Sequence, residues 1–125
     1  MASKTEVEVF LKEFKVKLNV FQILFRDERK KNSQFLLSLE LTPIARRKVI
    51  ESLEVVDYSE GPLDDTLYGI ASMWVFGKRV KKTEIYIKVS MGRSNEEVLC
   101  ISFHDAEESM NYPFKEYEYE KSDNR

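Results

Sequence analysis

The sequence predicts an α+β domain in which N-terminal helices pack on one face of a small, mainly antiparallel sheet. Two observations carry this prediction. Residues 7–18 and 42–53 repeat apolar side chains at helical spacing. Residues 73–104 instead hold three short runs in which apolar and polar side chains alternate, the pattern of strands with one face on a core. Because helical segments precede this meander, we expect the helices to cover one side of a single sheet.

The N-terminal segment begins with a strong helix signal. Ser3 and Glu6 have the spacing of a capping box, in which hydroxyl and carboxylate each satisfy a free amide at a helix start. The helix that follows repeats apolar residues on one face: Val7, Phe10, Leu11, Phe14 and Leu18. Residues 20–25 are short, apolar and β-favouring, so they predict a strand at a sheet edge. A second helix is expected around residues 35–39.

A third helix is predicted from Thr42, a good N-cap that is followed by Pro43 at the first helical position. We expect it to run to about residue 53. Its apolar side should bury Ile44, Val49, Ile50 and Leu53, and its wet side should expose Arg46, Arg47 and Lys48. Residues 54–71 then show no sustained period, so they predict a long loop, which is either functional or else partly helical or merely irregular.

Three strands are predicted at 73–80, 83–90 and 98–104, with Lys81 and Lys82 in the tight turn between the first two. In the last two strands one face is apolar, formed by Ile85, Ile87, Val89, Leu99, Ile101 and Phe103. The opposite face includes Tyr86, Lys88, Cys100, Ser102 and His104. All the apolar residues must reach one core, which selects the register that also gathers Tyr86, Lys88, Ser102 and His104.

The length and the charge distribution of the chain fit one domain followed by a short tail. The chain has 125 residues, and we expect residues 1–114 to form the domain and residues 115–125 an acidic, flexible tail. Residues 1–104 hold 17 Lys and Arg against 15 Asp and Glu, a balance of +2, whereas residues 105–125 hold 3 against 7, a balance of −4. A balance of +2 counts against a generally basic, nucleic-acid-binding body, so a polyanion would need a local cluster of cations.

Several classes are disfavoured. A single cysteine cannot form an internal disulfide, and one histidine gives no ligand cluster of zinc-site spacing, so no metal and no cofactor are expected. No apolar run approaches the length that spans a bilayer, and the N-terminal residues lack the apolar segment of a signal peptide. We therefore expect a cytoplasmic protein without a membrane partner.

The polar sheet face is the candidate site. A phenol (Tyr86), an imidazole (His104) and an ammonium (Lys88) on one rigid face can serve metal-free phosphodiester cleavage. They provide a base for the 2′-hydroxyl proton, an acid for the leaving oxygen and a cation for the phosphate. A solvated face of mixed polar residues is the commoner meaning of such a pattern, and this alternative stays open.

The sequence resembles the MqsR (motility quorum-sensing regulator) type of toxin, within the wider RelE-like group of ribonucleases from bacterial toxin–antitoxin pairs. The resemblance covers residues 7–114 in element order. It depends on four motifs: DYxxGP from residue 57, WVFG from 74, IYIK from 85 and CISFHxAE from 100. It implies a RelE-like α+β domain that cuts mRNA without a metal, with or without the ribosome, and is held inactive by a cognate antitoxin protein.

The resemblance also implies site residues. Tyr86 matches the active-site tyrosine of the family, and His104 stands where better-known members have a lysine. The resemblance also places Tyr58 and Glu60 among the substrate-binding residues. A loop lysine of those members falls near Glu60 here, and a glutamine falls at Val75, so neither function is kept at its position. We expect phosphate contacts from Lys88, with support from the turn cations Lys78, Arg79 and Lys82.

The leading expectation is therefore a toxin-type, metal-independent mRNA endoribonuclease with Tyr86 and His104 as acid and base. The second is a non-catalytic relative that binds a protein partner through the same sheet face and residues 54–71. A hydrolase that uses Cys100 is a distant third.

Overall fold

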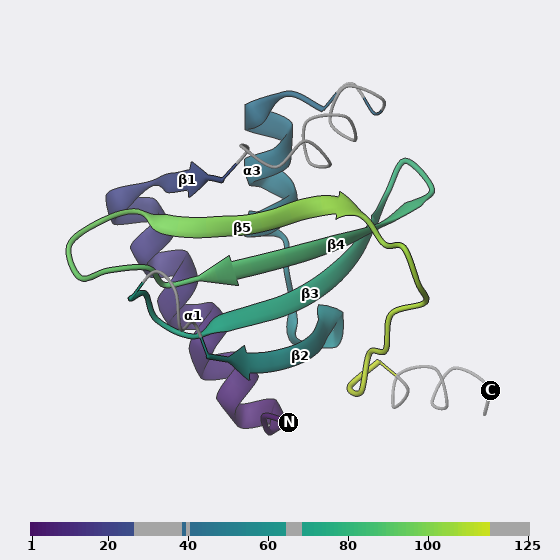
Figure 1. Ribbon diagram of the computed structural model, residues 1–125, viewed down its shortest axis with the longest axis horizontal. Coiled ribbons are helices and arrows are strands. Elements are labelled where there is room, and N and C mark those ends of the chain that lie inside the picture. The colour runs from purple at the N-terminus through teal and green to yellow at the C-terminus, as the bar shows by residue number, and fades with distance from the viewer. Residues whose placement is uncertain (27–38, 40, 65–68, 116–125) are drawn as a thin grey trace.

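The computed structural model describes residues 1–26, 39, 41–64 and 69–115. Within these ranges, five strands form one mixed, mostly antiparallel sheet in the order β1-β5-β4-β3-β2. Helix α1 (Lys4–Phe21) crosses one face of this sheet, and the core lies between them (Figure 1). The predicted α+β arrangement is confirmed.

Helix α1 begins as its sequence predicts. The Ser3 hydroxyl accepts from the Glu6 amide at 3.1 Å, and the Ser3 amide donates to Oε1 of Glu6 at 2.9 Å, so the capping box is complete. All five apolar residues of the predicted face are buried: Val7, Phe10, Leu11, Phe14 and Leu18. Phe10 stacks on Trp74 of the sheet with 4.4 Å between ring centroids, which fixes the helix against the strands.

Strand β1 (Ile23–Phe25) is shorter than predicted because α1 continues through residues 20 and 21. The prediction of a strand start at Val20 was wrong: this side chain is on the outer side of the helix, 64% exposed. The predicted edge position is confirmed, since β1 pairs with β5 alone, in parallel. The helix expected around residues 35–39 lies outside the described residues apart from Leu39.

Helix α3 (Pro43–Glu51) has the predicted cap, with the Thr42 hydroxyl accepting from the Ala45 amide at 3.1 Å. Its facing was predicted only in part. Ile50 and Leu53 are buried as expected, but Ile44 is 71% exposed and Arg46 only 6% exposed. The Arg46 guanidinium carbon lies 3.7 Å from the centroid of the Phe25 ring. A cation over an aromatic face, with its stem buried, takes the place expected for an aliphatic side chain.

The prediction of a long loop over residues 54–71 was wrong in part, because a partly helical segment was among the alternatives but a strand was not. These residues contain a short 3-10 helix (Val55–Asp57) and strand β2 (Tyr58–Leu63), which pairs antiparallel with β3. The register of β2 shifts twice, on either side of Glu60, and the strand holds Gly61 at φ 124° followed by Pro62. An edge strand tolerates a proline and such irregularity because its outer side makes no hydrogen bonds to another strand. The same irregularity removes the alternation of apolar and polar residues that would mark a strand in the sequence.

The predicted meander is confirmed as β3 (Met73–Val80), β4 (Thr83–Ser90) and β5 (Val98–Asp105). Lys81 and Lys82 form the tight turn, with φ of 51° and 68°. No helix in the described part of the chain has the length and apolar character that a bilayer crossing requires.

A bulge in β5 changes the predicted faces of that strand. Ser102 pairs with Lys88, but the next pair is Cys100 with Val89, so Ile101 is an extra residue on the β5 side. Beyond the bulge the facing is reversed. Cys100 is 1% exposed and belongs to the core, where Leu99 and Ile101 were expected. The prediction that Cys100 shares the polar face was wrong.

Candidate functional site

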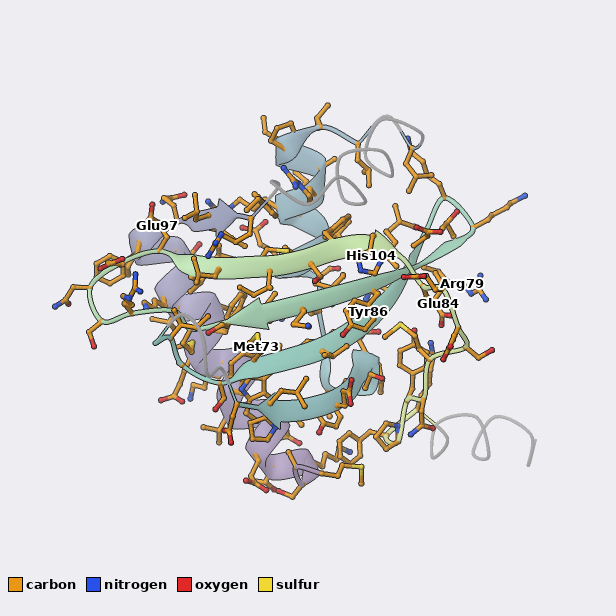
Figure 2. The ribbon with its side chains drawn as sticks, viewed as in Figure 1. Met73, Arg79, Glu84, Tyr86, Glu97 and His104 are labelled. Carbon is orange, nitrogen blue, oxygen red and sulfur yellow. The ribbon has the colours of Figure 1, made fainter. Side chains whose placement is uncertain are left out.

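The predicted register brings the two candidate catalytic residues together. Tyr86 of β4 pairs directly with His104 of β5, and their rings stack with centroids 5.1 Å apart and planes inclined by 9°. Lys88 pairs with Ser102 in the next polar row, and its Nζ lies 5.9 Å from the Tyr86 ring centroid. Figure 2 shows Tyr86 and His104 side by side near one end of these strands.

The hydrogen bond of His104 fixes the tautomer of its neutral ring. Nδ1 lies 2.9 Å from the backbone carbonyl oxygen of Asp105. A carbonyl only accepts, so Nδ1 carries the proton and Nε2 keeps a lone pair. Within the described part of the chain Nε2 has no hydrogen-bond partner, although the residue is only 8% exposed. The imidazole is thus held with a basic nitrogen available.

These groups line a cleft of about 480 Å³. One side of the cleft is the polar sheet face, and the other is the segment 106–111, which leads away from β5 (Figure 1). We call residues 106–114 the strap. The cleft is lined by Ser59, Glu60, Tyr86, Lys88, Ser102, His104, Ala106, Glu107, Glu108, Ser109, Met110 and Asn111.

The strap is attached to the sheet through Glu84. The Ala106 amide donates to the Glu84 carbonyl at 2.8 Å, and the Tyr112 hydroxyl donates to Oε2 of Glu84 at 2.6 Å. Tyr112 lies against Gly77, the residue that pairs with Tyr86 across β3 and β4. A Cβ atom at Gly77 would be 2.1 Å from the Tyr112 hydroxyl oxygen. The missing side chain therefore provides the space in which the strap is seated.

The Tyr112 phenol is held in its protonated form. Burial raises its pKa above the ordinary value of 10, and the hydrogen bond to Glu84 and the charge of that carboxylate raise it further. A group with a raised pKa in the folded state contributes stability that is complete below the unfolded pKa and is lost as the pH rises through the folded pKa. We expect wild type to lose stability more steeply above pH 10 than Tyr112→Phe does, as measured by urea unfolding across alkaline pH. Identical slopes would contradict this role of the phenol.

Charge is distributed unevenly across the cleft. The cation Lys88 comes from β4, whereas the carboxylates come from β2 (Glu60) and from the strap (Glu107 and Glu108). Glu60 pairs with Val75, which in turn pairs with Lys88, so the two charges lie two strands apart in one row. At the usual strand spacing this separates their backbones by about 10 Å. The cleft thus has a cationic side and an acidic side.

Two of the predicted substrate-binding residues lie outside this cleft. Lys78 pairs with Ile85 and faces the helix side, where its Nζ binds Oδ2 of Asp57 at 3.0 Å. Tyr58 is fully buried, and its hydroxyl donates to the Gly61 carbonyl at 2.5 Å. The bulge after Tyr58 explains how this residue and Glu60 come to differ in their surroundings.

The turn cations are also separate from the stacked pair. Nη1 of Arg79 donates to the Lys82 carbonyl at 3.3 Å, and both residues are exposed. Figure 2 shows Arg79 near the end of the β3–β4 ribbon. Neither Arg79 nor Lys82 lines the cleft. Lys88 is therefore the predicted phosphate-binding cation that the structure brings to Tyr86 and His104.

The strap was missed by the sequence reasoning, and with it Tyr112, Glu84 and Glu108. One signal was available: an isolated glycine within a strand, here Gly77, often marks a close approach by another part of the chain. The partner of that glycine could not be read from sequence spacing.

Within the described ranges, no three His, Cys, Asp or Glu side chains are grouped as ligands for a metal ion. Comparison with protein-family models, with curated proteins and with solved structures found no match to this chain. Functional assignment therefore depends on the chemistry of the cleft.

Proposed function

We propose that this protein is a metal-independent endoribonuclease, the toxin component of a bacterial type II toxin–antitoxin pair, with mRNA as substrate and a cognate antitoxin as inhibitor. One observation carries the proposal: a histidine whose Nε2 has no hydrogen-bond partner among the described residues is stacked on a tyrosine beside a lysine, in a cleft on a rigid sheet. The toxin context and the antitoxin are supported by the sequence resemblance alone.

The chemistry proceeds by transfer within the RNA. Nε2 of His104 takes the proton of a 2′-hydroxyl, and the 2′-oxygen forms a bond to the adjacent phosphorus. The bond from phosphorus to the 5′-oxygen breaks, and that oxygen takes a proton from the Tyr86 hydroxyl. Lys88 neutralises charge that develops on the phosphoryl oxygens. The products are a 2′,3′-cyclic phosphate and a 5′-hydroxyl, and no electrons are exchanged with any other group.

The test is cleavage of single-stranded RNA by the purified full chain in excess EDTA. We expect full activity in EDTA, products that end in 2′,3′-cyclic phosphate, and no cleavage when the nucleotide on the 5′ side of the cut carries a 2′-deoxy sugar. A strand that is cut equally well with the 2′-deoxy sugar would overturn the mechanism. Loss of all activity in EDTA would overturn metal independence.

Two lysines on opposite faces of the sheet provide a matched control for this test. Lys88→Gln should lower kcat/KM for RNA, because it removes the cation beside Tyr86. Lys78→Gln should leave cleavage unchanged and lower the free energy of unfolding, since its ion pair with the buried Asp57 carboxylate is lost. Equal effects of the two substitutions on cleavage would show that Lys88 acts only through the general charge of the protein.

A second candidate function is a non-catalytic module that binds a protein through the polar face. The observation that favours it is the acidic side of the cleft, formed by Glu60, Glu107 and Glu108, which repels a polyanion. Induced expression in bacterial cells separates the candidates: growth arrest that requires His104 supports the ribonuclease. Normal growth together with no RNA binding at low salt supports the protein-binding module.

A further inference from the structure

We propose that the acidic side of the cleft makes the ribonuclease base-selective: Glu60 and Glu108 favour a nucleotide whose base carries an exocyclic amino group, namely cytosine, adenine or guanine, over uracil. This inference rests on the proposed function and specifies the substrate at the same site.

The charged side chains of the cleft determine how a nucleotide is oriented in it. The phosphate of the RNA is attracted to Lys88, and the 2′-hydroxyl next to that phosphate must lie beside Nε2 of His104. The sugar–phosphate backbone of the RNA therefore lies over β4 and β5. Glu60 is two strands away, and Glu108 lies on the strap. A phosphate beside either carboxylate would be repelled. The base, which is neutral, is therefore the part of the nucleotide that faces the acidic side.

The hydrogen-bonding groups of the base determine which bases fit the acidic side of the cleft. An ionised carboxylate only accepts hydrogen bonds, so it is matched by a base edge that donates. The amino groups of cytosine, adenine and guanine are such donors, and pairing of a carboxylate with the cytosine amino group is a common form of base readout. Uracil has one N–H between two carbonyl oxygens, and those oxygens oppose a carboxylate.

The size of the cleft and the attachment of the strap also favour recognition of a single nucleotide. Its volume of about 480 Å³ is that of a small-molecule pocket, so it fits a nucleotide of a single strand rather than a duplex. The two hydrogen bonds to Glu84 attach the strap to the sheet on both sides of Glu108, at Ala106 and at Tyr112. His104 is nearly buried, and its Nε2 has no hydrogen-bond partner among the described residues. Independently of the carboxylates, this nitrogen indicates the place in the cleft where a ligand binds.

The experiment uses short oligouridine strands that carry a single central cytidine, adenosine or guanosine, together with the all-uridine strand. We expect wild type to cut next to the amino-bearing nucleotide at least about tenfold faster than anywhere in the all-uridine strand, since one good base contact contributes about 1–3 kcal/mol. Combined Glu60→Gln and Glu108→Gln should bring the ratio towards one. Glu97→Gln is the matched control, because Glu97 is exposed at the opposite end of β5 (Figure 2).

The outcomes separate this inference from the proposed function. Equal cleavage of all strands, or selectivity that survives the double substitution, overturns the base selectivity and leaves the ribonuclease in place. If no strand is cut, the proposed function fails, and fluorescence anisotropy with strands bearing a 2′-deoxy central nucleotide decides on the base preference. Tighter binding of the amino-bearing strands then supports the recognition by Glu60 and Glu108, and equal or absent binding overturns it.

Discussion

Replacing His104 with asparagine is expected to lower the rate of RNA cleavage by about 10²- to 10⁴-fold, the usual contribution of a positioned general base. The asparagine amide can still donate to the Asp105 carbonyl, as Nδ1 does in wild type. It has no atom at the position of Nε2, so the proton acceptor for the 2′-hydroxyl is lost. Initial rates at several RNA concentrations will show whether the loss lies in kcat, as expected for an interaction that is made in the transition state.

Tyr86→Phe is the companion variant. The phenylalanine ring keeps the stacking on His104 but loses the hydroxyl, so kcat should fall while thermal unfolding changes little. The effects of His104→Asn and Tyr86→Phe should be far from additive if the residues act as one acid–base pair. Wild-type activity in His104→Asn would remove the assignment of the base. A fall in activity that matches a fall in the folded fraction would reduce the role of the stacked pair to structure.

The periodic parts of the fold were predictable because each pattern of apolar side chains can be buried on one face by only one type of secondary structure. The capping box at Ser3 and the apolar face of α1 both favour a helix, and the alternation in β3 and β4 favours strands with one face on a core. The shared face of Tyr86 and His104 followed from the need to bury the apolar residues of both strands in one core, and the structure shows that the two residues also pair directly.

The failures have a common cause, which is that tertiary contacts overrode local patterns. The bulge at Ile101 shifts the ladder by one residue, and the shift turns Cys100 inward although strict alternation put it on the polar face. Arg46 is buried with its guanidinium over the Phe25 ring, a contact between residues 21 positions apart in sequence.

The candidate site divides in the same way. The side formed by Lys88 and His104 comes from one hairpin, and the face that these two residues share could be predicted from the hairpin register. Its acidic side needs β2, an irregular edge strand, and the strap, which approaches the sheet through Tyr112 and Glu84. Neither partner of that contact is marked by spacing, so the sequence does not show that Glu108 of the strap lies in the same cleft as Lys88.

Gly77→Ala is expected to lower the free energy of unfolding by about 1–3 kcal/mol, the usual cost of an added methyl group in a filled space. The new Cβ would lie 2.1 Å from the Tyr112 hydroxyl oxygen and 2.8 Å from Sδ of Met110, so the strap must move. Movement breaks the hydrogen bond from Tyr112 to Glu84 and displaces Glu108 from the cleft. Urea unfolding will measure the loss of stability, and RNA cleavage will show whether base selectivity falls with it.

The control for Gly77→Ala is the same substitution in a Tyr112→Ala background. Gly77 does not have a positive φ, so alanine is compatible with its backbone, and the cost arises from the strap alone. With the Tyr112 ring removed, the added methyl group meets less resistance, and Gly77→Ala should cost far less than in wild type. The coupling free energy of this double-mutant cycle therefore measures the seating of the strap on the sheet. A coupling near zero, with Gly77→Ala destabilising both backgrounds equally, would show that the glycine serves the strand itself and that the strap is held by other contacts.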